Sequence, residues 1–182
     1  MNKLFQYLKE LRYYFLIIAI LFVLAGIFSF IYPVFFKQYI FNLIQELGNK
    51  TSGMNFFELF IFIFKNNLLT SFMGVILGIF TIFPLIIALF NGYVLGFVSS
   101  LAVKSSGGLI LLKLLPHGIF ELPALILSLG LGLRLGMFIL AKNKKKDLLY
   151  NLKNSFWIFV YFIIPLLIIA ALIESLGIFF WK

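Results

Sequence analysis

The sequence has no cysteine, a single histidine and few charged residues. Without cysteine there is no disulfide, no thiolate metal ligand and no thiol nucleophile, and one histidine cannot by itself supply a zinc site. Charged residues make up 12% of the chain and hydrophobic residues 63%, of which Phe alone contributes 25 positions. A water-soluble surface cannot be built from what remains. The composition therefore predicts an integral membrane protein with no metal centre and no cofactor.

The net charge of +9 lies mainly at the ends of apolar segments. Lysines at these positions anchor to lipid headgroups and set the orientation of membrane helices. The expected partner of the positive charge is therefore the lipid bilayer, and nucleic acid is not expected.

Apolar stretches predict an all-α, polytopic membrane helix bundle that forms a single domain over residues 1–182. The expected spans are residues 13–36, 68–82, 84–103, 117–140 and 156–181. Residues 68–103 carry no charge, and as one helix they would extend about 54 Å, nearly twice the hydrocarbon thickness. Pro84 removes a helical hydrogen bond, so the break between the second and third spans is expected there.

Three amphipathic segments lie outside these spans. Residues 1–12 place Leu4, Leu8 and Leu11 on one helical face, as in a helix lying in the cytoplasmic interface. Residues 37–65 predict two short interfacial helices on the outer membrane surface, separated by a turn at residues 49–53.

Positive charge sets the expected orientation. Five lysines lie between the last two spans against one acid, Asp147, and such an excess marks a cytoplasmic loop. With the break at Pro84, this loop and the N-terminus are both cytoplasmic and the C-terminus is outside. Without the break, four spans would place the lysines outside, so five spans are preferred. The lysines are Lys142, Lys144, Lys145, Lys146 and Lys153.

Ionisable residues within the fourth span are candidates for an intramembrane site, because such groups are costly at membrane depth. His117 and Glu121 are four residues apart, so a helix places them on one face, where they could relay a proton or hold a cation. The alternatives are that His117 caps or pairs locally at the outer interface and that Glu121 is a buried structural acid. Pro116 and Pro123 predict a kinked or re-entrant segment around them.

Three further polar residues are expected at or near this site. Asn67 and Asn91 must find hydrogen-bond partners in the membrane; Asn91 could bond the broken backbone of residues 116–123 or line a solute path. Arg134 lies eight residues before Lys142, so it could reach the cytoplasmic headgroups, bind an anion, or pair with another helix or protomer.

Small residues four apart predict close helix contacts, since they let backbones approach each other. The pattern predicts a tight bundle of the second, third and fourth spans, with the first and fifth more peripheral; the same spacing also fits a homodimer. The glycines are Gly74, Gly78, Gly92, Gly96, Gly132 and Gly136.

The segment PHGIFELPALILSLGLGLRLG, residues 116–136, resembles the signature of the stage II sporulation protein M family. NLLTSFMGVILG, which begins at Asn67, and NGYVLG, which begins at Asn91, resemble its upstream Asn and Gly positions. The resemblance implies about five spans. In endospore formers the namesake acts with peptidoglycan-degrading partners in a membrane-remodelling complex, and the resemblance supplies no catalytic mechanism.

Two classes of function follow. No HExxH, GxSxG or glycine-rich phosphate loop is present, so an enzyme is not expected. A channel or transporter-like protein would use the polar residues of the fourth span to bind or pass a small ion or polar solute. The alternative is a scaffold subunit of a membrane-remodelling or cell-envelope complex, which would recruit other membrane or envelope proteins.

Overall fold

The computed structural model describes the backbone of residues 2–180 and their side chains except those of residues 2, 110, 112–117 and 180. This described part is helical and contains no strand. Five helical segments in it are long and apolar enough to cross a membrane, as predicted. The elements are α1 (Asn2–Glu10), α2 (Arg12–Ile31), α3 (Lys37–Thr51), α4 (Phe56–Ile76), η1 (Leu77–Ile79), α5 (Ile82–Ser106), η2 (Gly108–Ile110), α6 (Leu111–Gly136), η3 (Met137–Leu140), α7 (Lys144–Ile158), η4 (Phe159–Ile163) and α8 (Ile164–Phe180).

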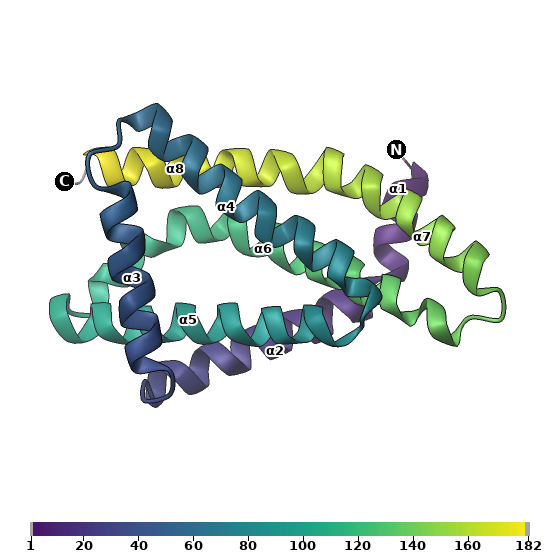
Figure 1. Ribbon diagram of the computed structural model, residues 1–182, viewed down its shortest axis with the longest axis horizontal. Helices are drawn as coiled ribbons and strands as arrows, with labels where there is room; N and C mark the ends of the chain where they lie inside the picture. The colour runs from purple at the N-terminus through teal and green to yellow at the C-terminus, as the bar shows by residue number, and fades with distance from the viewer. Residues whose placement is uncertain (1, 181–182) are drawn as a thin grey trace.

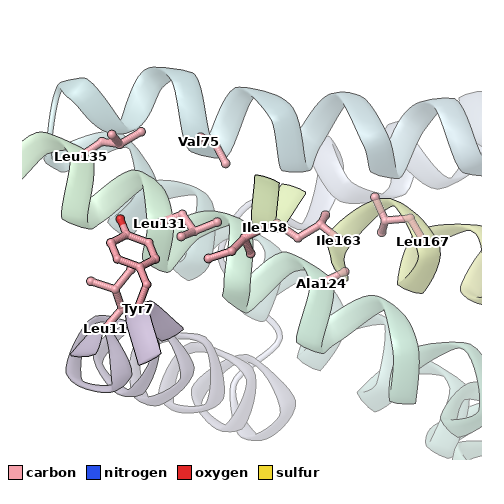
Figure 2. Packing of buried hydrophobic residues seen from close by; sticks show 9 residues of the cluster. All are labelled: Tyr7, Leu11, Val75, Ala124, Leu131, Leu135, Ile158, Ile163 and Leu167. Carbon is pink, nitrogen blue, oxygen red and sulfur yellow. The ribbon is translucent and has the colours of Figure 1, made fainter. Parts of the chain in front are cut away.

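The first helix matches the sequence pattern, whereas α2 ends at Ile31, five residues before the predicted end of the first span. Leu11 is buried and Leu4 and Leu8 pack beside it, so the predicted apolar face of α1 is confirmed. Tyr7 joins this face and is also buried, and Figure 2 shows it with Leu11 at one end of the main core. α1 therefore docks onto the bundle through a face that includes an aromatic ring.

The connection after α2 corrects the predicted outer segment. α3 is a separate helix that crosses one end of the long helices (Figure 1), which agrees with the first of the two expected interfacial helices. The second was wrong, because residues 56–65 belong to α4, which continues without a break to Ile76. Asn55 and Glu58 form a capping box that starts this helix, and Lys65, which suggested a boundary, lies on its exposed side. The second span is therefore Phe56–Ile79 and is full length.

The break between the second and third spans is confirmed near Pro84. The α-helical geometry ends at Ile76, one 3-10 turn follows in η1, and the chain bends at Phe80 before α5 begins at Ile82. Pro84 falls in the first turn of α5, where backbone N–H groups have no partner within the helix, so the missing N–H of proline costs no hydrogen bond. α4 and α5 diverge from this turn, and α3 crosses the open side of the angle between them (Figure 1).

α6 is the centre of the bundle. In its span, Gly118–Leu140, 56% of the most apolar stretch is buried, against 17% to 33% in the other four spans. It contacts α2, α4, α5 and α8. Its side chains form the middle of the core shown in Figure 2, where it contributes Ala124, Leu131 and Leu135. The neighbouring helices contribute the rest of this cluster: Val75 of α4, Ile158 of α7, Ile163 of η4 and Leu167 of α8.

All six predicted packing glycines lie at close helix contacts, but in two separate seams. Gly74 and Gly78 meet α6 at Gly132 and Gly136, where backbone lies against backbone. Gly92 and Gly96 instead meet α2, at Phe22 and Gly26. The predicted tight bundle of spans two, three and four is therefore wrong for the third span, which packs its glycine face on the first. The first span is nevertheless the least buried of the five, at 17%, as expected of a peripheral helix.

The last span is part of a long helical rod. α7, η4 and α8 follow one another without a connecting loop, and η4 is a π-helical turn. Pro165 explains this turn, because it cannot donate a hydrogen bond to the preceding turn and the backbone widens ahead of it. The rod from residue 144 to 180 is about 55 Å long, so its lysine-rich start extends past the hydrocarbon layer.

Candidate functional site

A small polar cavity lies where α4, α5, α6 and α8 meet, and Asn66 on its wall is exposed. It has a volume of about 110 Å³. Eight residues from α4, α5, α6 and α8 line it, and six of them are polar. They are Asn66, Asn67, Thr70, Ser71, Asn91, Glu121, Leu125 and Leu167.

The cavity lies near the middle of the long helices that line it. Asn67 is eleven residues from the start of α4, Asn91 nine from the start of α5 and Glu121 ten from the start of α6. Each is therefore about 14 to 16 Å from one end of its helix, close to half of a 30 Å hydrocarbon layer. Polar side chains at this depth require protein partners or water.

Helical periodicity explains the α4 wall. Asn66 and Thr70, and likewise Asn67 and Ser71, are four residues apart, so the two pairs form adjacent rows on one face. The Thr70 hydroxyl donates to the Asn66 carbonyl oxygen at 3.1 Å. Ser71 is buried, and Gly74 continues the same face into the contact with α6. This face of α4 is therefore polar up to Ser71 and is packed closely against α6 from Gly74, one helical turn later.

Three predicted site residues converge here. Asn67, Asn91 and Glu121 come from three different spans and line the same cavity. Asn91 donates through Nδ2 to the carbonyl oxygen of Ile87 at 2.8 Å, within its own helix. A further bond from Asn91 to the backbone of residues 116–123 stays a prediction. Glu121 is partly buried and makes a polar interaction within the protein.

The predicted re-entrant segment around Glu121 is wrong, because α6 is one α-helix from Leu111 to Gly136 and neither Pro116 nor Pro123 ends it. The other alternative, a kink within the helix, stays a prediction. Pro123 lies on the exposed side of the helix, while Ala124 and Leu125 beside it are buried against other spans. Packing on that inner face holds the helix together across the missing hydrogen bond. The His117 side chain lies outside the described residues, so its pairing with Glu121 stays a prediction.

Arg134 does not belong to the cavity. It forms a two-fold hydrogen-bonded ion pair with Asp147 of α7, with Nη2 to Oδ1 at 2.8 Å and Nη1 to Oδ2 at 3.0 Å. Each side chain is about one-fifth exposed, at 21% and 22%. Among the alternatives drawn from the sequence, pairing to another helix is the one observed. Its effect is to join the end of α6 to the first turn of α7.

A polar cluster next to this pair fixes α1. The Tyr7 hydroxyl donates to Asn151 Oδ1 at 2.8 Å, and Asn151 Nδ2 donates to the Asp147 carbonyl oxygen at 2.7 Å. Burial raises the pKa of the Tyr7 phenol above its usual value, so the ring stays neutral. α1, α6 and α7 are thus connected at the end of the bundle that carries the lysines.

Sequence reasoning missed three of the polar lining residues. Asn66 lay outside the span expected to begin at residue 68, so the polar face that it forms on α4 with Thr70 and Ser71 was not recognised. Two features of the sequence could have indicated this face. Asn66, Asn67, Thr70 and Ser71 have helical spacing, and the capping box of Asn55 and Glu58 marks an earlier start of the helix.

The chemistry available in the cavity is that of oxygen ligands. It offers one carboxylate, three carboxamides and two hydroxyls. Within the described residues, no three His, Cys, Asp or Glu side chains are grouped so that they could hold a metal ion. The arrangement suits a weakly held ion or small polar molecule.

Fold and site together define a polytopic helical membrane protein with a polar cavity between its central spans. The chain matches the sequence model of the stage II sporulation protein M family over residues 15–177, and it belongs to that family. An uncharacterized protein of Methanocaldococcus jannaschii is 34% identical over 119 residues, which are 62% of this chain and 52% of that protein. The chain thus spans about half of the length of this relative. No solved structure matches it.

Proposed function

We propose that this chain is a channel or transporter-like membrane protein whose intramembrane cavity binds and passes a small cation, a proton or a small polar solute. The observation that supports this is the convergence of Asn67, Asn91 and Glu121, from three spans, on one cavity near the middle of the long helices. Polar groups at this depth mark ion and solute paths in many membrane proteins. The proposed function is not enzymatic.

In this proposal the lining residues have distinct roles. Glu121 supplies the charge that attracts a cation or accepts a proton, while Asn67 and Asn91 replace part of the solute's hydration shell. The α4 and α5 walls diverge from η1, so a small change in their angle would alter access to the cavity. Between α4 and α6, the backbone contact at Gly78 and Gly132 closes the bundle toward η1.

The test is flux in proteoliposomes. We expect the native chain to pass a small cation or protons above empty liposomes, and Glu121→Gln to lower this flux by about tenfold or more, since a lost interaction of about 1.4 kcal/mol corresponds to tenfold. Glu174→Gln is the matched control, because Glu174 is the acid of α8 and is not among the cavity-lining residues. Equal loss in both variants, or no flux from a well-folded sample with any ion tried, would contradict the proposal.

A scaffold function is the second candidate. Two features favour it: α3 lies across one end of the bundle, and α7 extends past the hydrocarbon layer with its lysines exposed. Both surfaces are placed to contact other membrane or envelope proteins or a second copy of the chain. Absence of flux, together with co-purification of a defined partner that is lost when α3 or the lysines are altered, would favour this function.

We also propose that the lysine-rich end faces the cytoplasm. α1 and the start of α7 lie at one end of the long helices, and α3 and the C-terminal end of α8 lie at the other (Figure 1). The lysine excess at the first end is the positive-inside signal. A reporter inserted within residues 143–150 should read cytoplasmic, and one fused after Trp181 should read outside. The reverse result, or both reporters on one side, would contradict the orientation or the count of five spans.

A further inference from the structure

We infer that the start of α7 binds one anionic phospholipid, with the lipid phosphate between lysines and its acyl chains along the aromatic side chains that follow them. The site is an open groove of about 540 Å³. We call it the lysine groove, and it is lined by Asn143, Lys145, Lys146, Leu149, Tyr150 and Lys153. It is separate from the intramembrane cavity, and the inference does not depend on the proposed transport function.

The groove lies where the helical rod leaves the hydrocarbon layer. Trp157 and Tyr161 stack with their ring centroids 5.5 Å apart, and exposed aromatic rings of this kind are typical of the membrane boundary. Lys153 is about 6 Å along the helix from Trp157, within a headgroup region about 5 to 8 Å thick. Lys145 and Lys146 lie about 10 to 12 Å further along, and their long side chains can extend back toward the lipid. In Figure 1 this start of α7 projects beyond the other long helices.

Helical spacing continues the groove into the membrane-facing surface. Lys145, Leu149, Lys153 and Trp157 follow one another at intervals of four residues, so each lies beside the next on the helix. All four side chains are exposed. The row therefore begins with positive charge and ends with an aromatic ring, which is the order of headgroup and acyl chains in a phospholipid.

The positive charge of the groove is not balanced within the protein. Asp147 is the acid nearest in sequence, and both of its carboxylate oxygens accept from Arg134, at 2.8 and 3.0 Å. The described residues form two ion pairs, this one and Lys50–Glu46, and neither includes a lysine of the groove. The three groove lysines are therefore available to an external anion such as a lipid phosphate.

The lining favours a lipid over a soluble anion. Most of the surface that lines the groove is apolar, and Leu149 and Tyr150 are both more than half exposed. A soluble phosphate or a nucleic acid would neutralise the lysines but leave this apolar surface in water, which is unfavourable. The glycerol and the first methylene groups of a phospholipid would cover it.

Tyr150 gives the groove a fixed wall. Its ring packs edge-on against Tyr7 of α1, with the ring centroids 6.0 Å apart. The Tyr7 hydroxyl also donates to Asn151, at 2.8 Å, so the two helices are held together on both sides of this contact. A wall that is already ordered lowers the entropy cost of binding. The bound lipid should in turn stabilise the docking of α1.

A defined site differs from general attraction between lysines and an anionic membrane, which needs positive charge but no particular position. Lys142 and Lys144 belong to the same segment and are exposed, but they do not line the groove. Replacing them with glutamine removes as much charge as replacing Lys146 and Lys153. The inference predicts that only the second pair of changes strongly weakens lipid binding.

The test is quenching of Trp157 fluorescence by brominated phospholipids added to the full chain in detergent. The chain has two tryptophans, so Trp181→Phe leaves Trp157 as the reporter. Brominated phosphatidylglycerol should reach half-maximal quenching at a concentration at least about tenfold lower than brominated phosphatidylcholine. Lys146→Gln with Lys153→Gln should raise that concentration about fivefold for each lysine, and Lys142→Gln with Lys144→Gln should change it much less.

Thermal stability tests the native chain without any substitution. Phosphatidylglycerol at a hundred times its Kd should raise the melting temperature by about 5 °C or more relative to phosphatidylcholine with the same acyl chains. Glycerol phosphate, which has the anion without the chains, should not reproduce this rise.

Four results would overturn the inference. Equal quenching by the two phospholipids would show that the headgroup charge is not recognised. Equal loss in the two double-lysine variants would show diffuse attraction and no site. An equal rise in melting temperature with glycerol phosphate would identify a soluble anion as the ligand. No effect of phosphatidylglycerol, together with a purified protein partner whose binding requires Lys146 and Lys153, would assign the groove to that partner.

Discussion

Replacing Gly132 with leucine is expected to separate α4 from α6 and to prevent the native fold. A Cβ on Gly132 would overlap the Gly74 carbonyl oxygen and lie 3.3 Å from the Gly78 Cα, and these neighbours are backbone atoms that cannot rotate away. Overpacking costs about 1 to 3 kcal/mol where side chains can move. Here the helix itself must shift, so the loss should exceed that range and appear as an aggregated or unfolded peak in size-exclusion chromatography.

A graded alanine series tests the same contact without gross disruption. Gly132→Ala should lower the melting temperature most. Gly74→Ala should cost less, because its nearest neighbour is the end of the Leu129 side chain, at 2.6 Å from the added Cβ. Gly48→Ala in α3 has nothing within 4 Å and should be neutral or stabilising by about 0.5 to 1 kcal/mol. Equal effects at all three positions would show that the backbone contact does not limit stability.

Breaking the Arg134–Asp147 pair should give the second large effect. Arg134→Met leaves the Asp147 carboxylate partly buried without its partner, and Asp147→Leu leaves the Arg134 guanidinium partly buried without its partner. In either variant the two hydrogen bonds of the pair are lost. Each single change should cost about 2 to 3 kcal/mol, since hydrogen bonds to charged groups contribute about 1.5 to 3 kcal/mol. The double variant should lose less than the sum, and the double-mutant cycle measures the coupling.

The exposed pair Lys50–Glu46 is the control for this prediction. Its N–O distance is 2.7 Å, as short as in the Arg134 pair, but its side chains are 56% and 63% exposed. Lys50 lowers the pKa of Glu46 by a hydrogen bond and by its charge. Exposed pairs contribute little to stability. Removing either Lys50 or Glu46 should leave the melting temperature unchanged. A coupling energy of zero between Arg134 and Asp147 would contradict the prediction, because it would show that partial burial does not make that pair more stabilising than the exposed one.

Proline positions show where local sequence rules held and where they did not. Pro84 lies near a real break because it can occupy the first turn of α5, where its missing N–H leaves no intrahelical hydrogen bond unmade. Pro116 and Pro123 have the same local chemistry but sit in the helix that other spans surround. The cost of one lost hydrogen bond is small beside the packing of α6 against four neighbours. A proline therefore ends a helix only where the packing of that helix does not outweigh the lost hydrogen bond.

The candidate site was partly predictable. Glu121, Asn67 and Asn91 stood out because polar groups inside apolar runs are costly. Their convergence on one cavity depends on how α4, α5 and α6 cross, and no pattern within a single segment contains that information. Arg134 stood out for the same reason, and only the fold shows that its partner is Asp147, thirteen residues away on the next helix.

The sequence by itself determined the class of protein, the number of spans and the glycines at which helices approach, because hydropathy and residue size act over one helix at a time. Tertiary structure decided which spans those glycines join: Gly92 and Gly96 meet α2, while Gly132 meets α4. It also decided that six polar side chains share one cavity. Both outcomes depend on helix crossing angles, which follow from the packing of all five spans together and not from the periodicity of any one of them.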